Sequence, residues 1–405
     1  MKFNPAQNVQ NLQYFGEFGG VNPSIEDSST FTFLNAKKME EIFDKDVEGC
    51  YLYSRHWNPT NRYLSDALSK MENTEAAVVT ASGMSAITCV LLQLCSRGDE
   101  IVCSRMVYGG TYAFLKNVAP RFGITTRFVD ITNHKDIERA ITSETRLILC
   151  ESMSNPMLEI TDLPYLSMLA KKHKIQLVVD NTFTPMIFTP ANLGADIVIH
   201  SLTKFINGTS DTLAGVICGS HEFIQALSDV NHGTVMLLGP VMDSLRSASV
   251  LKNLHSLHLR IRKHSENALY LAKHFEKEGI EVRYPGLMSH PQHALMKKLM
   301  HPEFGFGGMM VINMGTKEKA YSLMEKMQKA NLGYLAVSLG FYKTLFSSPG
   351  TSTSSEIPEE ERKAMGLGDG LVRISVGLDA VIEATFLKMK KCLNEVQETQ
   401  LTSVS

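Results

Sequence analysis

The chain has 405 residues, of which 44% are hydrophobic and 20% are charged, and its formal net charge is −2. This length exceeds the size at which one hydrophobic core stops growing, so we expect two domains with an additional arm or linker. The near-neutral charge gives no bias towards nucleic acid or anionic membrane, and no apolar stretch approaches membrane-spanning length. We therefore expect a cytoplasmic protein.

The first segment, residues 1–60, is rich in Gly, Asn, Ser and aromatic residues and shows little sustained periodicity. It is predicted to be an extended arm. Tyr53 and Arg55 lie two positions apart near its end and form a candidate phosphate clamp. A surface arginine is the common alternative.

Helical and strand-like segments alternate from residue 61 onwards. Strands without polar alternation, separated by helices, indicate a mainly parallel sheet covered on both faces, so we predict an α/β large domain over 61–258. A long helical segment over 242–278 leads to a smaller α+β domain over 259–405. The other predicted helices are 86–94, 111–118, 163–172 and 380–396, and the predicted strands are 100–103, 126–129, 147–151, 176–180, 197–200, 214–218, 309–314 and 371–376.

The seven cysteines show neither a C-x-x-C pair nor any other spacing typical of metal ligands or disulfide frameworks. Most of them lie in apolar segments. We therefore expect buried thiols in a reducing compartment and no metal site.

The ends of two predicted strands carry the most informative residues. Asp180 closes one strand, and Lys204 follows the next strand, with Ser201 and Thr203 beside it. Sites in parallel sheets lie at the carboxyl ends of the strands. This combination suits pyridoxal phosphate, which needs an amine for covalent attachment, a carboxylate to keep its ring nitrogen protonated, and donors for its phosphate. Taken singly, a loop lysine and a turn-forming aspartate are commoner meanings.

Three further segments could complete such a site. Ser82, Gly83 and Met84 precede an apolar helix, whose free amides could hold a phosphate, although a simple N-cap is the common meaning. Tyr108 lies on a glycine-rich turn, where it could stack on a flat heterocycle and exchange a proton, or be a core tyrosine. Arg373 interrupts an apolar strand and needs an anion, either a substrate carboxylate or an internal acid.

Together these motifs resemble the Cys/Met-metabolism family of pyridoxal-phosphate enzymes, the group of cystathionine γ-lyase, cystathionine γ-synthase and methionine γ-lyase. The resemblance covers nearly the whole chain. It rests on Tyr53-Ser54-Arg55, Asn58-Pro59-Thr60, Ser82-Gly83-Met84, Tyr108-Gly109-Gly110-Thr111, Asn155-Pro156, Val179-Asp180-Asn181-Thr182-Phe183, Ser201 to Lys204, Asn207-Gly208, Asp211 and Arg373-Ile374-Ser375-Val376-Gly377.

The resemblance implies a fold like aspartate aminotransferase (pyridoxal-phosphate fold type I) and a homotetramer, a dimer of dimers with active sites shared across subunits. It implies that Tyr53 and Arg55 reach the cofactor phosphate of the neighbouring subunit. Lys204 would hold the cofactor, Asp180 its ring nitrogen, and Tyr108 would stack on the ring. The remaining implied contacts are Ser82, Gly83, Met84, Ser201 and Thr203 at the phosphate, Asn155 near the ring hydroxyl, and Ser338, Thr353 and Arg373 at the substrate.

Within the family, the segments 338–342 and 352–356 resemble plant-type methionine γ-lyases. Their better-known bacterial counterparts carry a cysteine two residues after the stacking tyrosine, where this chain has Gly110. We predict γ-elimination on a sulfur amino acid, preferably methionine, giving methanethiol, ammonia and 2-oxobutanoate, with Lys204, Tyr108 and Asp180 as catalytic residues.

Three alternatives share the same residues. The first is γ-replacement on an O-acyl-homoserine, as in cystathionine γ-synthase or O-acetylhomoserine sulfhydrylase. The second is cystathionine γ-lyase activity, and the third is a catalytically silent, ligand-binding member of the fold. Substrate choice depends on pocket shape, which sequence does not resolve.

Overall fold

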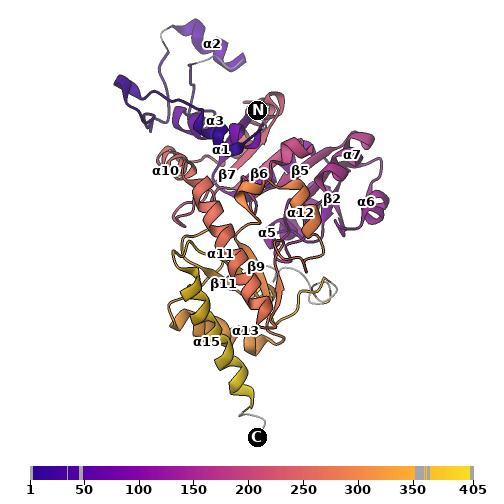
Figure 1. Ribbon diagram of the computed structural model, residues 1–405. Coiled ribbons are helices and arrows are strands. Elements are labelled where there is room, and N and C mark those ends of the chain that lie inside the picture. Colours follow the sequence, from indigo (N-terminus) through magenta and orange to yellow (C-terminus); the bar gives the residue numbers. More distant parts are fainter. Residues whose placement is uncertain are drawn as a thin grey trace.

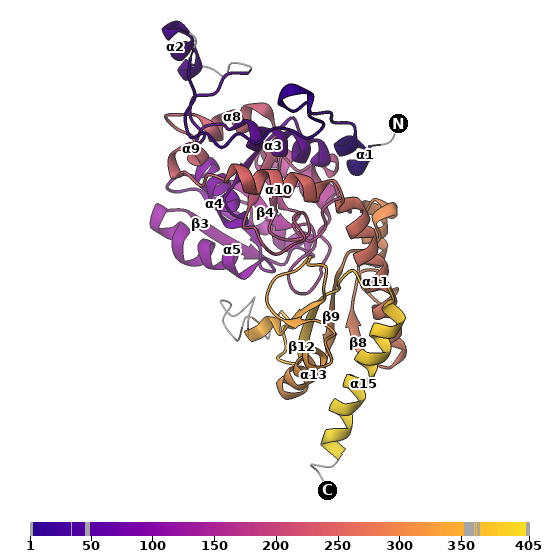
Figure 2. The same cartoon turned by 90° about the vertical axis from the view of Figure 1, so that its left-hand side faces the viewer.

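The computed structural model describes residues 3–33, 35–44, 49–351, 360, 362 and 365–401. It contains a large sheet and a small sheet in different parts of the molecule, with helix α2 (Ala36–Asp44) at one end and helix α15 (Ile382–Leu401) at the other (Figures 1 and 2). Among the described residues, no helix is both long enough and apolar enough to cross a membrane.

The large sheet has seven strands in the order β1-β7-β6-β5-β4-β2-β3. Only β7 runs antiparallel to its neighbours, which confirms the predicted mainly parallel sheet. The strands are buried along almost their whole length except at the edge strand β3, as expected for a sheet covered on both faces. They are β1 (Ala76–Thr80), β2 (Glu100–Ser104), β3 (Thr125–Val129), β4 (Thr145–Glu151), β5 (Gln176–Asp180), β6 (Ile197–Ser201) and β7 (Gly215–Gly219).

Each helix predicted in this part of the chain is present, although several bounds differ, and the helices at Pro59–Glu72, His134–Ala140, His221–Ser228 and Thr234–Leu238 were not predicted. The predicted helix over 111–118 divides into α5 and a π-helical turn (Phe114–Val118), and the predicted segment over 242–278 divides into two helices around 255–256. The helices are α3 (Pro59–Glu72), α4 (Gly83–Leu94), α5 (Gly109–Ala113), α6 (His134–Ala140), α7 (Leu163–His173), α8 (His221–Ser228), α9 (Thr234–Leu238), α10 (Ser244–Leu254) and α11 (Leu257–Lys277).

The small sheet has five strands in the order β10-β11-β12-β9-β8, and all neighbours are antiparallel except β10 and β11. This mixture of antiparallel strands and helices confirms the predicted α+β character of the C-terminal part. Its elements are β8 (Glu281–Arg283), α12 (His293–Leu299), β9 (Met309–Asn313), α13 (Lys317–Lys329), β10 (Tyr334–Leu335), β11 (Leu345–Ser347), β12 (Leu371–Ser375) and α15.

The N-terminal segment is not extended throughout, so that prediction was partly wrong. Helix α1 (Pro5–Gln10) begins where the side chain of Asn4 accepts the Gln7 amide, and Pro5 occupies its first turn. Helix α2 stands out from the rest of the molecule in both views (Figures 1 and 2). The six residues of α1 are too few to show helical periodicity in the sequence.

Two clusters of buried apolar side chains accompany the two sheets. Helix α11 contributes to both, with Leu257 and Ile261 in the larger cluster and Leu271 and Phe275 in the smaller. The helix therefore ties the two sheets together. The division of the chain into 1–60, 61–258 and 259–405 remains a prediction.

Candidate active site

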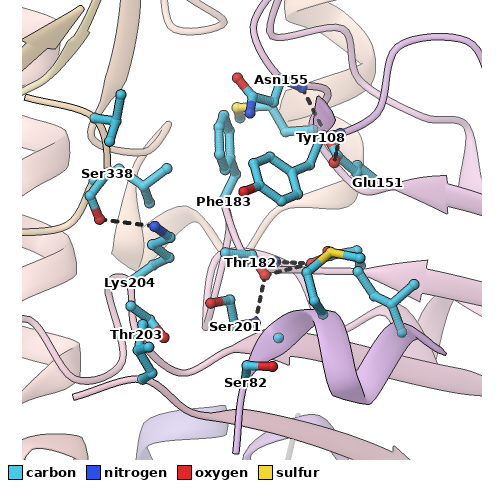
Figure 3. Close-up of a pocket in the computed structure, with 18 of the residues that line it drawn as sticks. Ser82, Tyr108, Glu151, Asn155, Thr182, Phe183, Ser201, Thr203, Lys204 and Ser338 are labelled. Atoms are coloured by element: carbon cyan, nitrogen blue, oxygen red, sulfur yellow. Dashed lines mark hydrogen bonds between the residues drawn. The ribbon is translucent and has the colours of Figure 1, made fainter. Parts of the chain in front are cut away.

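A cavity of about 230 Å³ lies at the carboxyl ends of the large-sheet strands, and residues of the C-terminal part also line it (Figure 3). The structure brings most of the predicted site residues together around it. Those that line it are Ser82, Gly83, Met84, Tyr108, Asn155, Asp180, Ser201, Thr203, Lys204, Ser338 and Arg373.

One end of the cavity is suited to an anion. The side chain of Ser82 caps α4 by accepting the Ser85 amide. The first-turn amides of Gly83 and Met84 have no acceptor within the helix, as at any helix start. This capping box also explains why the helix begins at Gly83, three residues before the predicted start. A Cβ atom at Gly83 would lie 2.7 Å from the Cβ atom of Ser201, so glycine lets the helix N-terminus approach that serine.

Thr203 lies at the same end, but its hydroxyl already closes a turn. The Thr203 Oγ1 atom accepts the amide of Ala214 at 3.0 Å and donates to the Ala214 carbonyl at 3.3 Å. A phosphate contact would have to replace the longer of these two bonds, because the hydroxyl has one hydrogen to donate.

Asp180 ends β5 and forms part of the cavity lining. Its Oδ1 atom accepts the amide of Thr182 at 2.9 Å and the Thr182 hydroxyl at 2.5 Å. Burial raises the pKa of the Asp180 carboxyl, whereas the bonds from Thr182 and the charge of His200 lower it. A protonated ring nitrogen beside this carboxyl would favour its ionised form.

Glu151, which ends the neighbouring strand β4, is a site residue that the sequence did not reveal as one. It lies opposite Asp180 in the sheet register, and its two carboxylate oxygens accept the amides of Tyr108 and Asn155. Burial and the charge of Asp180 raise the pKa of Glu151 well above its ordinary range. An acid at a strand end was the signal that could have found it, since it is the same signal that singled out Asp180.

Tyr108 precedes α5 and presents its ring to the cavity beside Phe183 (Figure 3). The ring also covers Gly110, because a Cβ atom built there would lie 2.6 Å from Cε1 of Tyr108 and 3.2 Å from the sulfur of Met84. The absence of a side chain at position 110 therefore allows this orientation of the tyrosine ring.

Lys204 extends into the cavity and donates from its Nζ atom to the Oγ atom of Ser338 at 2.9 Å (Figure 3). Burial, with a smaller contribution from the charge of Arg373, lowers the pKa of the Lys204 amine from 10.5 to about 8. A buried amine of lowered pKa is more often unprotonated at neutral pH, so more of it is available to act as a nucleophile or a general base.

This shift gives a pH-dependent expectation. In the cofactor-free protein, the rate at which acetic anhydride acylates Lys204 should rise with pH and reach half its maximum near pH 8, because only the unprotonated amine reacts. Mass spectrometry of the peptide that contains Lys204 measures this rate. The urea-unfolded chain is the control, with the ordinary lysine value of 10.5. Identical pH profiles for the folded and unfolded chains would contradict the shift.

Arg373 reaches the cavity from β12 of the small sheet and is only 2% exposed. Its Nη1 atom donates to Oδ1 of Asn155 at 3.0 Å, and its Nη2 atom donates to the carbonyl of Ser338 at 3.4 Å. Burial lowers the pKa of the guanidinium to about 10, so the side chain remains a cation at neutral pH. The small sheet thus places the guanidinium of Arg373, and the large sheet the carboxyl group of Asp180, at one cavity.

Two predicted site residues, Tyr53 and Arg55, do not line this cavity. Tyr53 is 43% exposed, and Arg55 donates to the carbonyl of Met236 at 3.0 Å on another part of the surface. Thr353 lies outside the described residues. The lining residues that were not among the predicted site residues are Glu151, Thr182 and the apolar side chains Ile87, Met153, Phe183, Leu213, Val337 and Leu339.

The groups that line the cavity fit pyridoxal phosphate. They include an amine of lowered pKa at Lys204, a carboxyl at Asp180, the open N-terminus of α4 and the aromatic ring of Tyr108. Each meets one requirement of the cofactor, namely attachment, ring protonation, phosphate binding and stacking.

Comparison with known proteins points to the same cofactor. The family model described as Cys/Met metabolism PLP-dependent enzyme matches residues 6–385. A methionine gamma-lyase of Arabidopsis thaliana is 44% identical over 96% of this chain and 89% of its own length. An L-methionine gamma-lyase of Fusobacterium nucleatum subsp. polymorphum is 37% identical over 90% of this chain and 91% of its own length.

Among solved structures, a cystathionine gamma synthase from Xanthomonas oryzae pv. oryzae, in complex with aminoacrylate and cysteine, has a TM-score of 0.89 and 30% identity. The similarity covers 98% of this chain and 100% of that one. This likeness confirms the predicted fold class, a type I fold with a mainly parallel large sheet.

Proposed function

Because the chain belongs to the Cys/Met-metabolism family of pyridoxal-phosphate-dependent enzymes, we propose that it catalyses γ-elimination on L-methionine. The products are methanethiol, ammonia and 2-oxobutanoate, with one water consumed. The observation that carries the proposal is the 44% identity to a plant methionine gamma-lyase over 96% of the chain. The cavity that joins Lys204 to Asp180 supports it.

When bound, pyridoxal phosphate supplies an electron sink that acidifies the protons on Cα and then on Cβ of an amino acid. Lys204 would hold the cofactor, and Asp180 would keep the ring nitrogen protonated. The amides of Gly83 and Met84, with Ser82, Ser201 and Thr203, would bind the phosphate. The support for these assignments is the shared lining of one cavity.

The proton transfers fall to two side chains in this proposal. The Nζ atom of Lys204 would take the Cα proton of the substrate, a role suited to an amine with a pKa of about 8. The hydroxyl of Tyr108 donates a proton to the departing sulfur. Arg373 and Ser338 bind the substrate carboxylate, together with Thr353, and thereby orient the Cα–H bond.

Replacing Arg373 with alanine should raise KM more than it lowers kcat, because a guanidinium that grips the carboxylate contributes mainly to substrate binding. Loss of such a charge-assisted contact predicts a kcat/KM lower by about 10²-fold. Steady-state kinetics with methionine measure both constants, and Arg373→Lys should recover part of the loss. An unchanged kcat/KM would assign Arg373 to structure alone, through its bond to Asn155.

Replacing Gly110 with cysteine should displace the ring of Tyr108, since the new Cβ atom would lie 2.6 Å from it. We expect kcat/KM to fall about 10-fold or more, because small misplacements of a reacting group are costly. Gly368→Ala is the matched control, as its Cβ atom would meet nothing within 4 Å. Equal activity in both variants would show that the tyrosine position does not depend on Gly110.

Self-association as a homotetramer, a dimer of dimers, is also part of the proposal. Tyr53 and Arg55 do not line the cavity of their own chain, and Arg55 bonds to the carbonyl of Met236 on α9, where the next two side chains, Leu237 and Leu238, are exposed. Apolar exposure of this kind is typical of surfaces that bind a partner. Light scattering should give a mass of about four chains, and a monomer would contradict the proposal.

We place the protein in the cytoplasm in the same proposal. All seven cysteines are free thiols, and six of them are buried. Free thiols are usual in reducing compartments. Fractionation of cells that express the protein, followed by immunodetection, tests the location.

The test of the activity uses purified holoprotein with methionine, cystathionine and O-acetylhomoserine in turn, each with and without an added thiol. Release of methanethiol and 2-oxobutanoate from methionine, at a higher kcat/KM than for the other two substrates, supports γ-elimination on methionine. A product that forms from O-acetylhomoserine only with thiol present, without turnover of methionine, would favour γ-replacement instead. A colourless purified protein would favour a ligand-binding role.

A further inference from the structure

Glu151 connects the two loops that carry Tyr108 and Asn155. The amide of Tyr108 donates to Oε1 of Glu151 at 2.7 Å, and the amide of Asn155 donates to Oε2 at 2.9 Å (Figure 3). The first loop follows β2 and the second follows β4. The carboxyl group of Glu151 therefore joins a residue 43 positions earlier in the chain to one 4 positions later. Both segments form part of the cavity wall.

We propose that Glu151 is a positioning residue that holds Tyr108 and Asn155 at their places around the cofactor ring. The inference rests on the proposed use of pyridoxal phosphate. In this proposal Glu151 does not react itself. It fixes the loop that carries the ring of Tyr108 and the loop that carries the side chain of Asn155.

The chemistry of the two contacts specifies a glutamate. Both partners are N–H donors, so the side chain must offer two acceptor oxygens, and the carboxyl group of a glutamate does so. Glutamine offers one acceptor oxygen, and its NH₂ group would face a second donor. Aspartate keeps the carboxyl group, but it is shorter by one methylene and cannot reach both amides from the same backbone position.

The position of Glu151 makes a purely structural role costly. The residue is 8% exposed and lies opposite Asp180 in the β4–β5 register, so two acids share the same end of the sheet. Burying a carboxylate beside another acid is unfavourable unless hydrogen bonds compensate, and an apolar residue would fill a merely structural position at less cost.

The influence of Glu151 extends to the substrate side of the cavity. The Asn155 residue that it holds accepts a hydrogen bond from Arg373 at 3.0 Å. A chain of contacts therefore runs from Glu151 through Asn155 to Arg373, the proposed carboxylate binder. Movement of the Asn155 loop should therefore disturb both cofactor and substrate.

The experiment compares holoprotein of the wild type with Glu151→Gln, Glu151→Asp and the control Glu144→Gln, whose exposed carboxylate directly precedes β4. Four readouts are taken: the thermal unfolding midpoint, the visible circular dichroism of bound cofactor, the Kd for pyridoxal phosphate added to apoprotein, and kcat and KM. Kinetics use whichever amino acid the wild type consumes.

We expect Glu151→Gln to lower kcat by about 10- to 100-fold, as misplaced reacting groups do, and to raise the cofactor Kd about 10-fold. Its visible circular dichroism should change, because the ring of Tyr108 is no longer fixed against the cofactor. Glu151→Asp should fall between Glu151→Gln and the wild type, since it can hold one loop. Glu144→Gln should match the wild type in all four readouts.

Variants that keep the wild-type dichroism, Kd and kcat per folded molecule, whatever their unfolding midpoint, would overturn the proposal. If Glu151→Gln does not fold, Glu151→Asp decides by the same three readouts. Failure of the methionine reaction alone leaves the comparison intact, because dichroism and Kd require no substrate. A wild-type protein that binds no pyridoxal phosphate would overturn both this proposal and the proposed function.

Discussion

Replacing Lys204 with alanine is expected to lower kcat/KM for methionine by at least about 10³-fold, because the same amine would bind the cofactor and move the Cα proton. The geometry supports both roles. The Nζ atom lies in the cavity, 2.9 Å from the hydroxyl of Ser338, and its pKa of about 8 leaves a useful fraction unprotonated at neutral pH. Methanethiol release measures the loss.

A second measurement, on the wild-type protein, tests whether Lys204 is the point of cofactor attachment. Borohydride reduction of wild-type holoprotein should leave a pyridoxyl group on the peptide that contains Lys204, and mass spectrometry detects it. Lys172→Ala is the control, since that side chain is exposed near the end of α7. A Lys204→Ala protein with turnover comparable to that of Lys172→Ala would remove Lys204 from the mechanism.

The sequence was sufficient to predict the part of the site that the large sheet carries. The bounds predicted for β5 match the structure, and those for β6 differ by one residue, because apolar β-branched segments with polar ends are typical of buried parallel strands. Parallel neighbours end at the same edge of a sheet. Asp180 and Lys204 could therefore be placed at one cavity before any contact was known.

Contacts between distant segments were beyond the reach of the sequence pattern. Glu151 binds backbone amides, which carry no residue-specific signal, and its bond to the Tyr108 amide depends on how the loop after β2 folds back. The bond from Arg373 to Asn155 joins residues 218 positions apart across the two sheets. The pattern identified Arg373 as a cation that needs an anion, but it could not choose between a substrate and an internal partner.

Local irregularities explain the remaining differences. Strand β1 (Ala76–Thr80) was not predicted, because five residues directly after a helix give little periodicity to count. The start of α4 was misplaced because the capping box depends on the side chains of Ser82 and Ser85 rather than on apolar spacing. The role of Gly110 became visible only when the ring of Tyr108 was found where a Cβ atom would lie.

Replacing Asp180 with asparagine is expected to lower kcat/KM about 10²-fold, similar in size to the loss of other preorganised charge interactions in active sites. Asparagine has the shape of aspartate and its oxygen can still accept the bonds from Thr182, so the local fold should persist. The neutral amide cannot stabilise a cationic ring nitrogen, and the cofactor becomes a weaker electron sink.

Steady-state kinetics and the pH dependence of the cofactor's visible absorbance measure this loss. Asp130→Asn is the matched control, because Asp130 follows strand β3 of the same sheet but pairs with Arg105 at 2.6 Å near the surface. Loss of that partly exposed pair should cost at most about 1 kcal/mol of stability and no activity. Equal kinetics in the two variants would mean that Asp180 does not face the ring nitrogen. Glu151, the acid beside it in the sheet, would then be the next candidate for that charge.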